Sequence, residues 1–140
     1  MVKIESLDTR ANAEAGVKFV PKHPKTGVPL DCYLILRGQD SRTYKASLME
    51  RRRARLARSA KLQASGQPQE IDLDNLEAEA LESLVSMTLG FGGWSKGDDA
   101  ELPYSAANAR LLYESLDWLR EQAQIFIGDR ANFLPDSATS

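Results

Sequence analysis

The chain has 140 residues, 42% of them hydrophobic and 27% charged, which is enough for one domain with a core of its own. Its 18 basic and 20 acidic residues leave a formal net charge of −2, which excludes wholesale disorder and a globally basic nucleic-acid-binding protein. No window approaches the ~20 apolar residues that span a bilayer, and the start lacks the apolar stretch of a signal peptide. We therefore expect a single cytoplasmic domain over residues 1–140, with no membrane contact.

Residues 1–38 predict a β-hairpin preceded by a short helix. Two β-forming runs, 17–21 and 30–37, are separated by KHPKTGVP, whose prolines, glycine and lysines are typical of a turn or short loop. Residues 8–15 predict one or two helical turns, with Asp8 or Thr9 as the N-cap and Gly16 as the C-cap.

Three helices are predicted after the hairpin. A basic helix over 40–65 begins at an Asp40-Ser41 cap, carries a thin apolar stripe and ends at ASGQPQ. An acidic helix over 71–90 begins at an Asp72 cap and ends at Gly90, and a Gly- and aromatic-containing loop follows over 91–104. The third helix, 105–127, has apolar residues at steps of 3, 4, 3, 4 and 3, and would be ~35 Å long. With a disordered tail over 134–140, the prediction is a mostly helical α+β fold with a small N-terminal antiparallel hairpin.

The two predicted central helices carry opposite charge. Residues 41–65 contain eight basic residues and one acidic residue, whereas residues 70–101 contain nine acidic residues and one lysine. Like charges three or four residues apart destabilise a helix by ~0.2–0.5 kcal/mol per pair, so the basic helix needs a negative partner. That partner is the acidic helix of the same chain or of a neighbouring copy, an acidic segment of another protein, or nucleic acid. Charge-mediated association into a homo-oligomer would use Arg51, Arg52, Arg55, Arg58, Glu77 and Glu79.

Two features argue against the nucleic-acid alternative, although the run ERRRARLAR has suitable electrostatics. No aromatic residue is interleaved with its arginines for base stacking, and the acidic block nearby would repel phosphates. This alternative, a small regulatory or nucleic-acid-binding protein that uses Arg51 to Lys61, stays open.

The composition predicts neither an enzyme nor a cofactor or metal site. His23 lies in the predicted turn and Cys32 in an apolar β-forming run, and neither has a visible catalytic partner. The cluster GFGGWSKG is not a phosphate-binding loop, because Lys96 is followed by Gly97 rather than by Ser or Thr. We read it as a flexible connection in which Phe91 and Trp94 pack on the core or on a partner.

An ordered set of short motifs resembles a known family. In chain order the motifs are Trp94, LPYS at 102–105, NAR at 108–110, Leu112-Tyr113, Gln122 and DRANF at 129–133, with GVKF, PKTG and LRGQDS in the N-terminal part. This set resembles the tail assembly chaperones of long-tailed bacteriophages and prophages. The resemblance implies a non-enzymatic protein of the bacterial host cytoplasm, absent from the mature virion. Such a protein binds the tape measure protein and helps recruit tail-tube subunits.

Aromatic residues and arginines dominate binding hot spots, so we expect partner binding by six such residues in or near these motifs. They are Phe91, Trp94, Tyr104, Arg110, Arg130 and Phe133. If the helix over 105–127 is continuous, Trp94 and Tyr104 lie at one end of it and Phe133 lies at the other, ~35 Å away. The basic run is not part of the family pattern.

Overall fold

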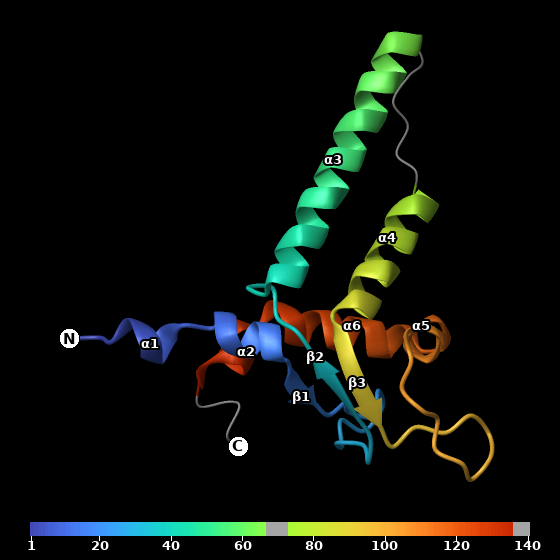
Figure 1. Cartoon of the computed structure of the whole chain (residues 1–140). Helices are drawn as coiled ribbons and strands as arrows, with labels where there is room; N and C mark the ends of the chain where they lie inside the picture. Colours follow the sequence, from blue (N-terminus) through green and yellow to red (C-terminus); the bar gives the residue numbers. More distant parts are fainter. Residues whose placement is uncertain (67–72, 136–140) are drawn as a thin grey trace.

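The computed structural model describes residues 1–66 and 73–135, which form the predicted mostly helical α+β fold (Figure 1). The predicted Asp72 cap and the tail from residue 136 onward lie outside the described residues. Two short N-terminal helices precede the hairpin, the first of which was not predicted. In chain order the elements are α1 (Ile4–Leu7), α2 (Arg10–Ala15), β1 (Val17–Phe19), β2 (Tyr33–Leu36), α3 (Arg42–Ser65), α4 (Leu73–Ser86), β3 (Thr88–Gly92), α5 (Ala106–Ser115), α6 (Asp117–Gly128) and the 3₁₀ helix η1 (Arg130–Phe133).

The sheet of the described residues has the strand order β1-β2-β3, and both strand pairs are antiparallel. The predicted hairpin is confirmed, with Val17 opposite Leu36, but the sheet is not purely N-terminal because β3 comes after α4. The prediction that 88–92 ends a helix and starts a flexible loop is wrong. Gly92 helps β3 to pair with β2, because a Cβ at this position would lie 2.7 Å from the Tyr33 ring on β2. Gly92 thus lets β3 lie close against β2.

The C-terminal helices cover the sheet and fill the core. Leu34 and Leu36 alternate with half-buried residues along β2 and contribute to the same core as Tyr113 of α5 and Leu119 of α6. Other buried members of this core are Phe19, Leu84, Val85, Met87, Phe91, Ala109, Leu112, Ala123 and Ile127. The 3,4 spacing thus correctly identified a core-forming segment.

The prediction of one continuous helix over 105–127 is wrong, because the chain breaks at Leu116, which has φ −127° and ψ 89°. The flanking Ser115 and Asp117 are weak helix formers, and Asp117 is favoured in the first turn of the new helix. The break redirects the chain so that residues of both α5 and α6 reach the core. The predicted Ser105 cap is confirmed, since its Oγ accepts a hydrogen bond from the Asn108 backbone N–H at 3.0 Å.

Helices α3 and α4 project from the rest of the molecule as an arm (Figure 1). The arm is defined here as residues 42–65 and 73–86, and the other described residues form the body. The Ser41 side chain caps α3 by accepting from the Tyr44 backbone N–H at 3.1 Å, as the sequence predicts. At ~1.5 Å per residue, the 24 residues of α3 extend ~36 Å, and none of them is buried. Helix α4 buries only Leu84 and Val85, close to the sheet.

Candidate partner-binding surfaces

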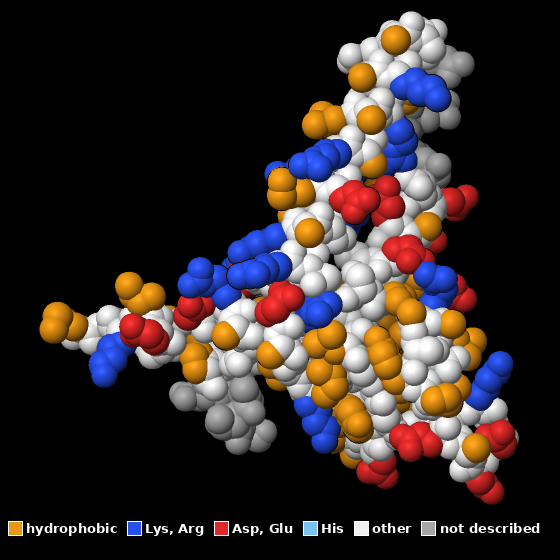
Figure 2. All heavy atoms as spheres, viewed as in Figure 1, with side chains coloured by type: hydrophobic (Ala, Val, Ile, Leu, Met, Phe, Trp, Pro, Cys, Tyr) orange, Lys and Arg blue, Asp and Glu red, His pale blue; other side chains and the backbone are white. Residues whose placement is uncertain are grey.

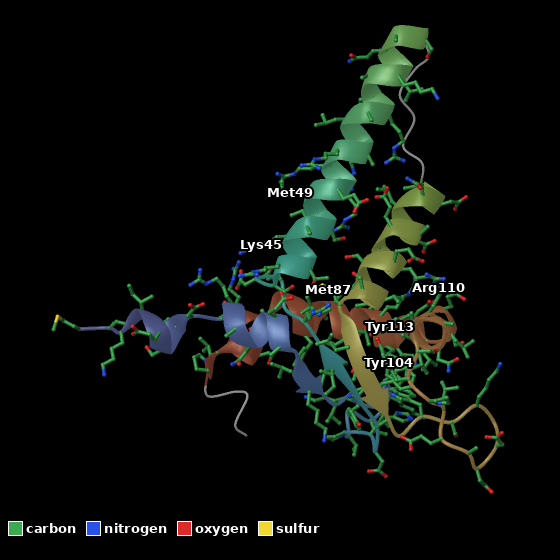
Figure 3. The ribbon with its side chains drawn as sticks, in the orientation of Figure 1. Lys45, Met49, Met87, Tyr104, Arg110 and Tyr113 are labelled. Carbon is green, nitrogen blue, oxygen red and sulfur yellow. The ribbon has the colours of Figure 1, made fainter. Side chains whose placement is uncertain are left out.

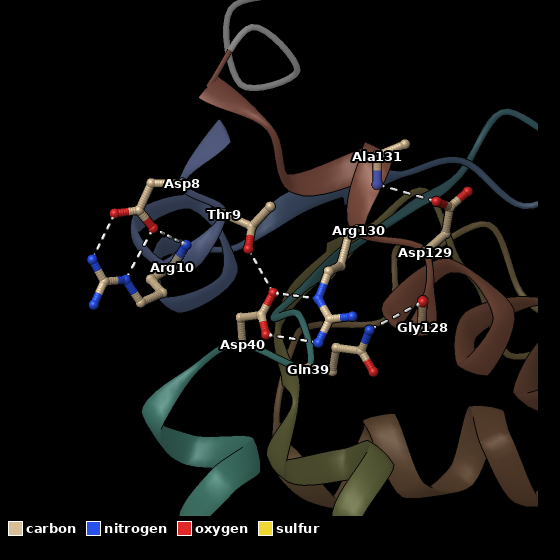
Figure 4. Close-up of polar contacts among 9 residues, drawn as sticks. All are labelled: Asp8, Thr9, Arg10, Gln39, Asp40, Gly128, Asp129, Arg130 and Ala131. Carbon is tan, nitrogen blue, oxygen red and sulfur yellow. Dashed lines mark hydrogen bonds and ion pairs between the residues drawn. The ribbon is translucent and has the colours of Figure 1, made fainter. Parts of the chain in front are cut away.

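A polar cluster holds the base of the arm (Figure 4). The Asp40 carboxylate, just before α3, accepts hydrogen bonds from Arg130 Nε at 2.9 Å, from Arg130 Nη2 at 3.2 Å and from the Thr9 hydroxyl at 2.5 Å. These bonds hold the pKa of Asp40 below its ordinary value. Gln39 Nε2 also donates to the Gly128 carbonyl at 3.2 Å. The Asp40 cluster therefore joins the N-terminal segment, the start of the arm and the C-terminal turn.

Two predicted partner-binding residues, Arg130 and Phe133, lie at this end of the body. Arg130 is engaged with Asp40, although 64% of its side chain stays exposed. Phe133 is buried against Phe126, with ring centroids 5.6 Å apart. A Cβ at Gly38 would lie 3.0 Å from the Phe133 ring, so a larger residue there would press against this ring. Phe133 thus belongs to the interior, and partner binding by Arg130 stays a prediction.

Three other predicted residues, Phe91, Trp94 and Tyr104, come together at the sheet. Phe91 is buried in β3, and the Tyr104 ring packs edge-on against it at 5.4 Å. The Tyr104 hydroxyl donates to the Thr88 carbonyl at 2.8 Å, and 44% of the residue remains exposed. Trp94 is half-buried, and its Nε1 donates to the Tyr33 carbonyl at 3.3 Å. Phe91 and Trp94 therefore pack on the core, whereas Tyr104 keeps a surface that a partner could contact.

Arg110, the remaining predicted residue, connects the body to the arm. Its Nη2 forms an ion pair with Glu82 Oε1 of α4 (Figure 3). Nearby, the Tyr113 hydroxyl lies 2.6 Å from Thr88 Oγ1, which donates to the Leu84 carbonyl at 2.9 Å. Burial raises the pKa of Tyr113 above its ordinary value. The sequence did not predict this buried network, because the expected helix over 71–90 includes Thr88, whereas in the structure Thr88 begins β3.

A cleft of about 690 Å³ lies between α3 and α4. Small side chains face it from both helices, so the described residues of the two helices leave the space between them unfilled. They include Ala46 and Ser47 of α3 and Ala78 and Ser83 of α4, with charged residues such as Arg51 and Glu79 beside them. A cleft of this volume can accept side chains of another helix or peptide.

The charged groups of the cleft are only partly paired. Glu79 Oε1 accepts from Arg58 Nη2 at 3.3 Å and from Asn75 Nδ2 at 3.1 Å. Its Oε2 and Arg51 Nε are buried without a hydrogen-bond partner among the described residues. A buried polar group left unpaired costs ~1–3 kcal/mol, so a rearrangement of the arm that paired these two atoms would stabilise it. The walls of the cleft therefore carry charged residues whose hydrogen bonding is incomplete.

The positive and negative helices lie side by side in one chain, in line with the first alternative drawn from the charges. Among the six predicted association residues, Arg58 and Glu79 form an ion pair within the chain, and Arg51 is half-buried between the helices. The other three, Arg52, Arg55 and Glu77, are exposed. Helix α4 therefore neutralises only part of the charge of α3.

The face of α3 that points away from α4 combines cations with exposed apolar side chains. Figure 2 shows both kinds along the outer edge of α3, and Figure 3 shows Lys45 and Met49 on that side. We call this face the outer stripe; it consists of Lys45, Leu48, Met49, Arg52, Arg55 and Leu56. Its exposed fractions are 37% for Leu48, 55% for Met49 and 70% for Leu56. The thin apolar stripe of the sequence is thus at the surface and not in the core.

Comparison with family models, curated proteins and solved structures found no match for this chain. Across residues 1–66 and 73–135, no group of three or more His, Cys, Asp or Glu side chains could hold a metal ion. In the same segments no helix is both long and apolar enough to cross a membrane. Cys32 is buried, and burial together with the nearby Asp31 carboxylate raises the pKa of its thiol.

Proposed function

We propose that this protein is a non-enzymatic phage tail assembly chaperone that binds a helical segment of the tape measure protein and helps recruit tail-tube subunits. The ordered motif set described above supports the family assignment. The cleft between α3 and α4 carries the proposed mode of binding, because it is open, lined by small residues and flanked by incompletely paired charges. The side chains of a bound helix would enter the cleft, and their polar groups would pair with Arg51 and Glu79. Tyr104 and Arg130 offer additional contacts on the body.

A separate arm suits this role for a physical reason. Most core residues belong to the body, and the arm adds only Leu84 and Val85 at the base of α4. A substrate can therefore be held and released on the outer part of the arm without unfolding the protein. The incompletely paired charged side chains of the cleft would set the register of the bound helix. The small side chains would allow the backbone of that helix to come close to α3 and α4. Release would need only the loss of these few contacts.

Co-expression with the tape measure protein tests the proposal. The wild-type full-length chain is expected to keep that protein soluble and to co-purify with it. A tape measure protein that stays insoluble, or that is never captured, would contradict the chaperone function itself.

Variants that fill the cleft test the binding mode separately. Ala46→Phe and Ser83→Phe each place a large ring in the cleft, so they should abolish capture while circular dichroism and melting temperature stay close to wild type. Ala60→Phe is the matched control, because Ala60 is exposed on α3 and does not line the cleft. Normal capture by both cleft variants would place the binding surface elsewhere, with Tyr104 the next position to test.

The exposed cations of α3 support a second candidate, nucleic-acid binding through Arg51 to Lys61. Fluorescence anisotropy with duplex DNA and with single-stranded RNA tests it, because phosphate-driven binding weakens steeply with salt. Binding that persists at physiological salt and is lost in Arg52→Glu/Arg55→Glu would favour this candidate over the chaperone.

A further inference from the structure

A second space lies at the base of the arm, where α3, α4 and α6 come together. Its volume is about 240 Å³, and we call it the foot pocket; its apolar lining consists of Tyr44, Ala80, Leu84, Met87 and Ile127. Three of these residues, Leu84, Met87 and Ile127, are buried members of the core, and Figure 3 shows Met87 at the base of the arm. The foot pocket therefore has an apolar floor that is continuous with the core.

The foot pocket is connected to the cleft between α3 and α4. Arg51 and Ser83 line both spaces, and the exposed residues Gln124 and Gly128 border the foot pocket on the side of α6. Binding sites for whole small molecules usually have volumes of ~300–1,000 Å³. The smaller foot pocket suits one large side chain of a partner whose backbone lies in the cleft.

Arg51 supplies a positive charge at the point where the two spaces meet. Its side chain is half-buried and forms no ion pair or hydrogen bond within residues 1–66 and 73–135. By contrast, Arg58 is paired with Glu79 and Arg110 with Glu82. The Nε of Arg51 is buried, which leaves its two Nη groups to bind a partner. A guanidinium offers parallel N–H donors that match the two oxygens of a carboxylate, so charge complementarity favours an acidic group here.

We propose that the foot pocket and Arg51 together select a helical segment that carries a bulky apolar side chain and a carboxylate one helical turn apart. The apolar side chain would fill the foot pocket, and the carboxylate would accept hydrogen bonds from the Nη groups of Arg51. Arg51 itself lines the foot pocket, so the two groups must project from the same face of the bound helix. Residues three or four positions apart meet this condition, with Cβ atoms ~5–6 Å apart, whereas residues two positions apart do not.

This inference rests on the proposed function, because it specifies which segments the cleft would bind. An apolar floor beside an unpaired cation requires both features in the same ligand. A segment with only the apolar residue would leave Arg51 without a partner, and a segment with only the carboxylate would leave the foot pocket unfilled.

Peptide binding to the full-length chain tests the proposal. The probes are fluorescently labelled peptides of ~20 residues based on alanine and glutamine, which are long enough to form a helix in water. The lead peptide carries Phe and Glu one turn apart, and two versions with opposite sequence order cover both directions of the bound helix. Three control peptides replace Phe by Ala, replace Glu by Gln, or place Phe and Glu two positions apart. Fluorescence anisotropy should give a dissociation constant at least about tenfold lower for the better lead peptide than for each control.

Variants of the protein then assign each preference to its residue. Arg51→Gln should remove the preference for Glu over Gln, because it removes the charge. Ala80→Leu should remove the preference for Phe over Ala, because the larger side chain fills the foot pocket. Arg52→Gln and Ala57→Leu are the matched controls, since both positions are exposed on α3 and line neither space. Circular dichroism checks that each variant keeps its fold, and the comparison of peptides on the wild-type chain needs no variant.

The outcomes separate the possible occupants. Both preferences in the wild type, each lost in its own variant and kept in the controls, would support the proposal. A wild-type chain that binds no peptide or binds all peptides equally would overturn it, and so would preferences that survive Arg51→Gln and Ala80→Leu. An Ala80→Leu variant that changes the sedimentation coefficient without changing peptide binding would also overturn it, because a second copy would then occupy the foot pocket.

Capture of the tape measure protein is scored separately. Capture by the wild-type chain without the peptide preferences would overturn this inference and leave the proposed function standing. Peptide preferences without capture would contradict the proposed function, and the partner would then be another protein with a segment of the same kind.

Discussion

The body and the arm of this molecule differ in where their apolar and charged side chains lie. In the body, apolar residues of β2, β3, α5 and α6 meet in one core, to which the arm adds only Leu84 and Val85 of α4. The Asp40 cluster also joins distant segments of the chain. In the arm, α3 buries nothing and carries exposed apolar and basic side chains, and one face of α4 lines an incompletely paired cleft. The body therefore supplies the stability of the fold, and the arm supplies surfaces whose contacts are completed by partners.

Removing the same side chain from each region should give the largest difference. Leu119 is fully buried in the body and Leu56 is 70% exposed on the arm. Leu119→Ala should lower the free energy of unfolding by ~2–5 kcal/mol, because it leaves a cavity in the core. Leu56→Ala should change it by less than ~0.5 kcal/mol. Urea denaturation measures both values, and similar losses for the two variants would show that α3 is packed as tightly as the core helices.

The next largest loss of stability is expected for a substitution where β2 and β3 lie close together. Gly92→Ala places a Cβ about 2.7 Å from the Tyr33 ring, so the ring or the strand must shift. Overpacking of this kind costs ~1–3 kcal/mol. Thermal denaturation, with Gly128→Ala as the control because a Cβ there meets nothing, measures the effect. An unchanged melting temperature would mean that the Tyr33 ring does not rest on β3.

The Asp40 cluster should contribute a smaller and pH-dependent amount. The pKa of Asp40 is lower in the folded protein than in the unfolded chain, so the unfolded chain binds the extra proton first. The contribution is therefore complete above about pH 4 and is lost as the pH falls through the lowered pKa. Asp40→Asn should lower the melting temperature at pH 7, and the difference from wild type should shrink below about pH 4. A difference that is independent of pH would show that the Arg130 contact does not stabilise the fold.

The ion pair inside the arm should have the smallest effect. Arg58 Nη2 lies 3.3 Å from Glu79 Oε1, and 45% of the Arg58 side chain is exposed. Pairs of this kind contribute ~0–1 kcal/mol and are screened by salt. A double-mutant cycle with Arg58→Ala and Glu79→Gln measures the coupling free energy. A coupling well above ~1 kcal/mol would mean that the arm is held together by its own charges, which would weaken the contrast with the body.

The sequence predicted features that depend on local patterns. The hairpin, the Ser41 and Ser105 caps and the apolar face of 105–127 follow from turn residues and spacing, and the structure confirms them. The strand at 88–92 was missed because the helical period runs through Met87 and the glycines resemble a loop. The break at Leu116 was missed because apolar spacing alone does not show where a helix changes direction.

The candidate site could be predicted from the sequence less well than the fold. Charge counting identified α3 and α4 as a complementary pair, but the cleft depends on how the two helices diverge. The contact of Arg130 with Asp40 joins residues 90 positions apart, and no local pattern predicts it. Phe91 was singled out in the glycine-rich cluster and Phe133 in the ordered motif set, and the structure shows that both side chains are buried.

Hydrogen exchange on the full-length chain, alone and in complex with the tape measure protein, tests the division between body and arm most directly. In the free protein at low concentration, the amides of α3 should exchange much faster than those of β2 and α6, because α3 buries no residue. In the complex, protection should increase in α3 and α4 and stay nearly unchanged in the body. Slow exchange of α3 in the free chain, or new protection confined to residues 93–105, would contradict the account.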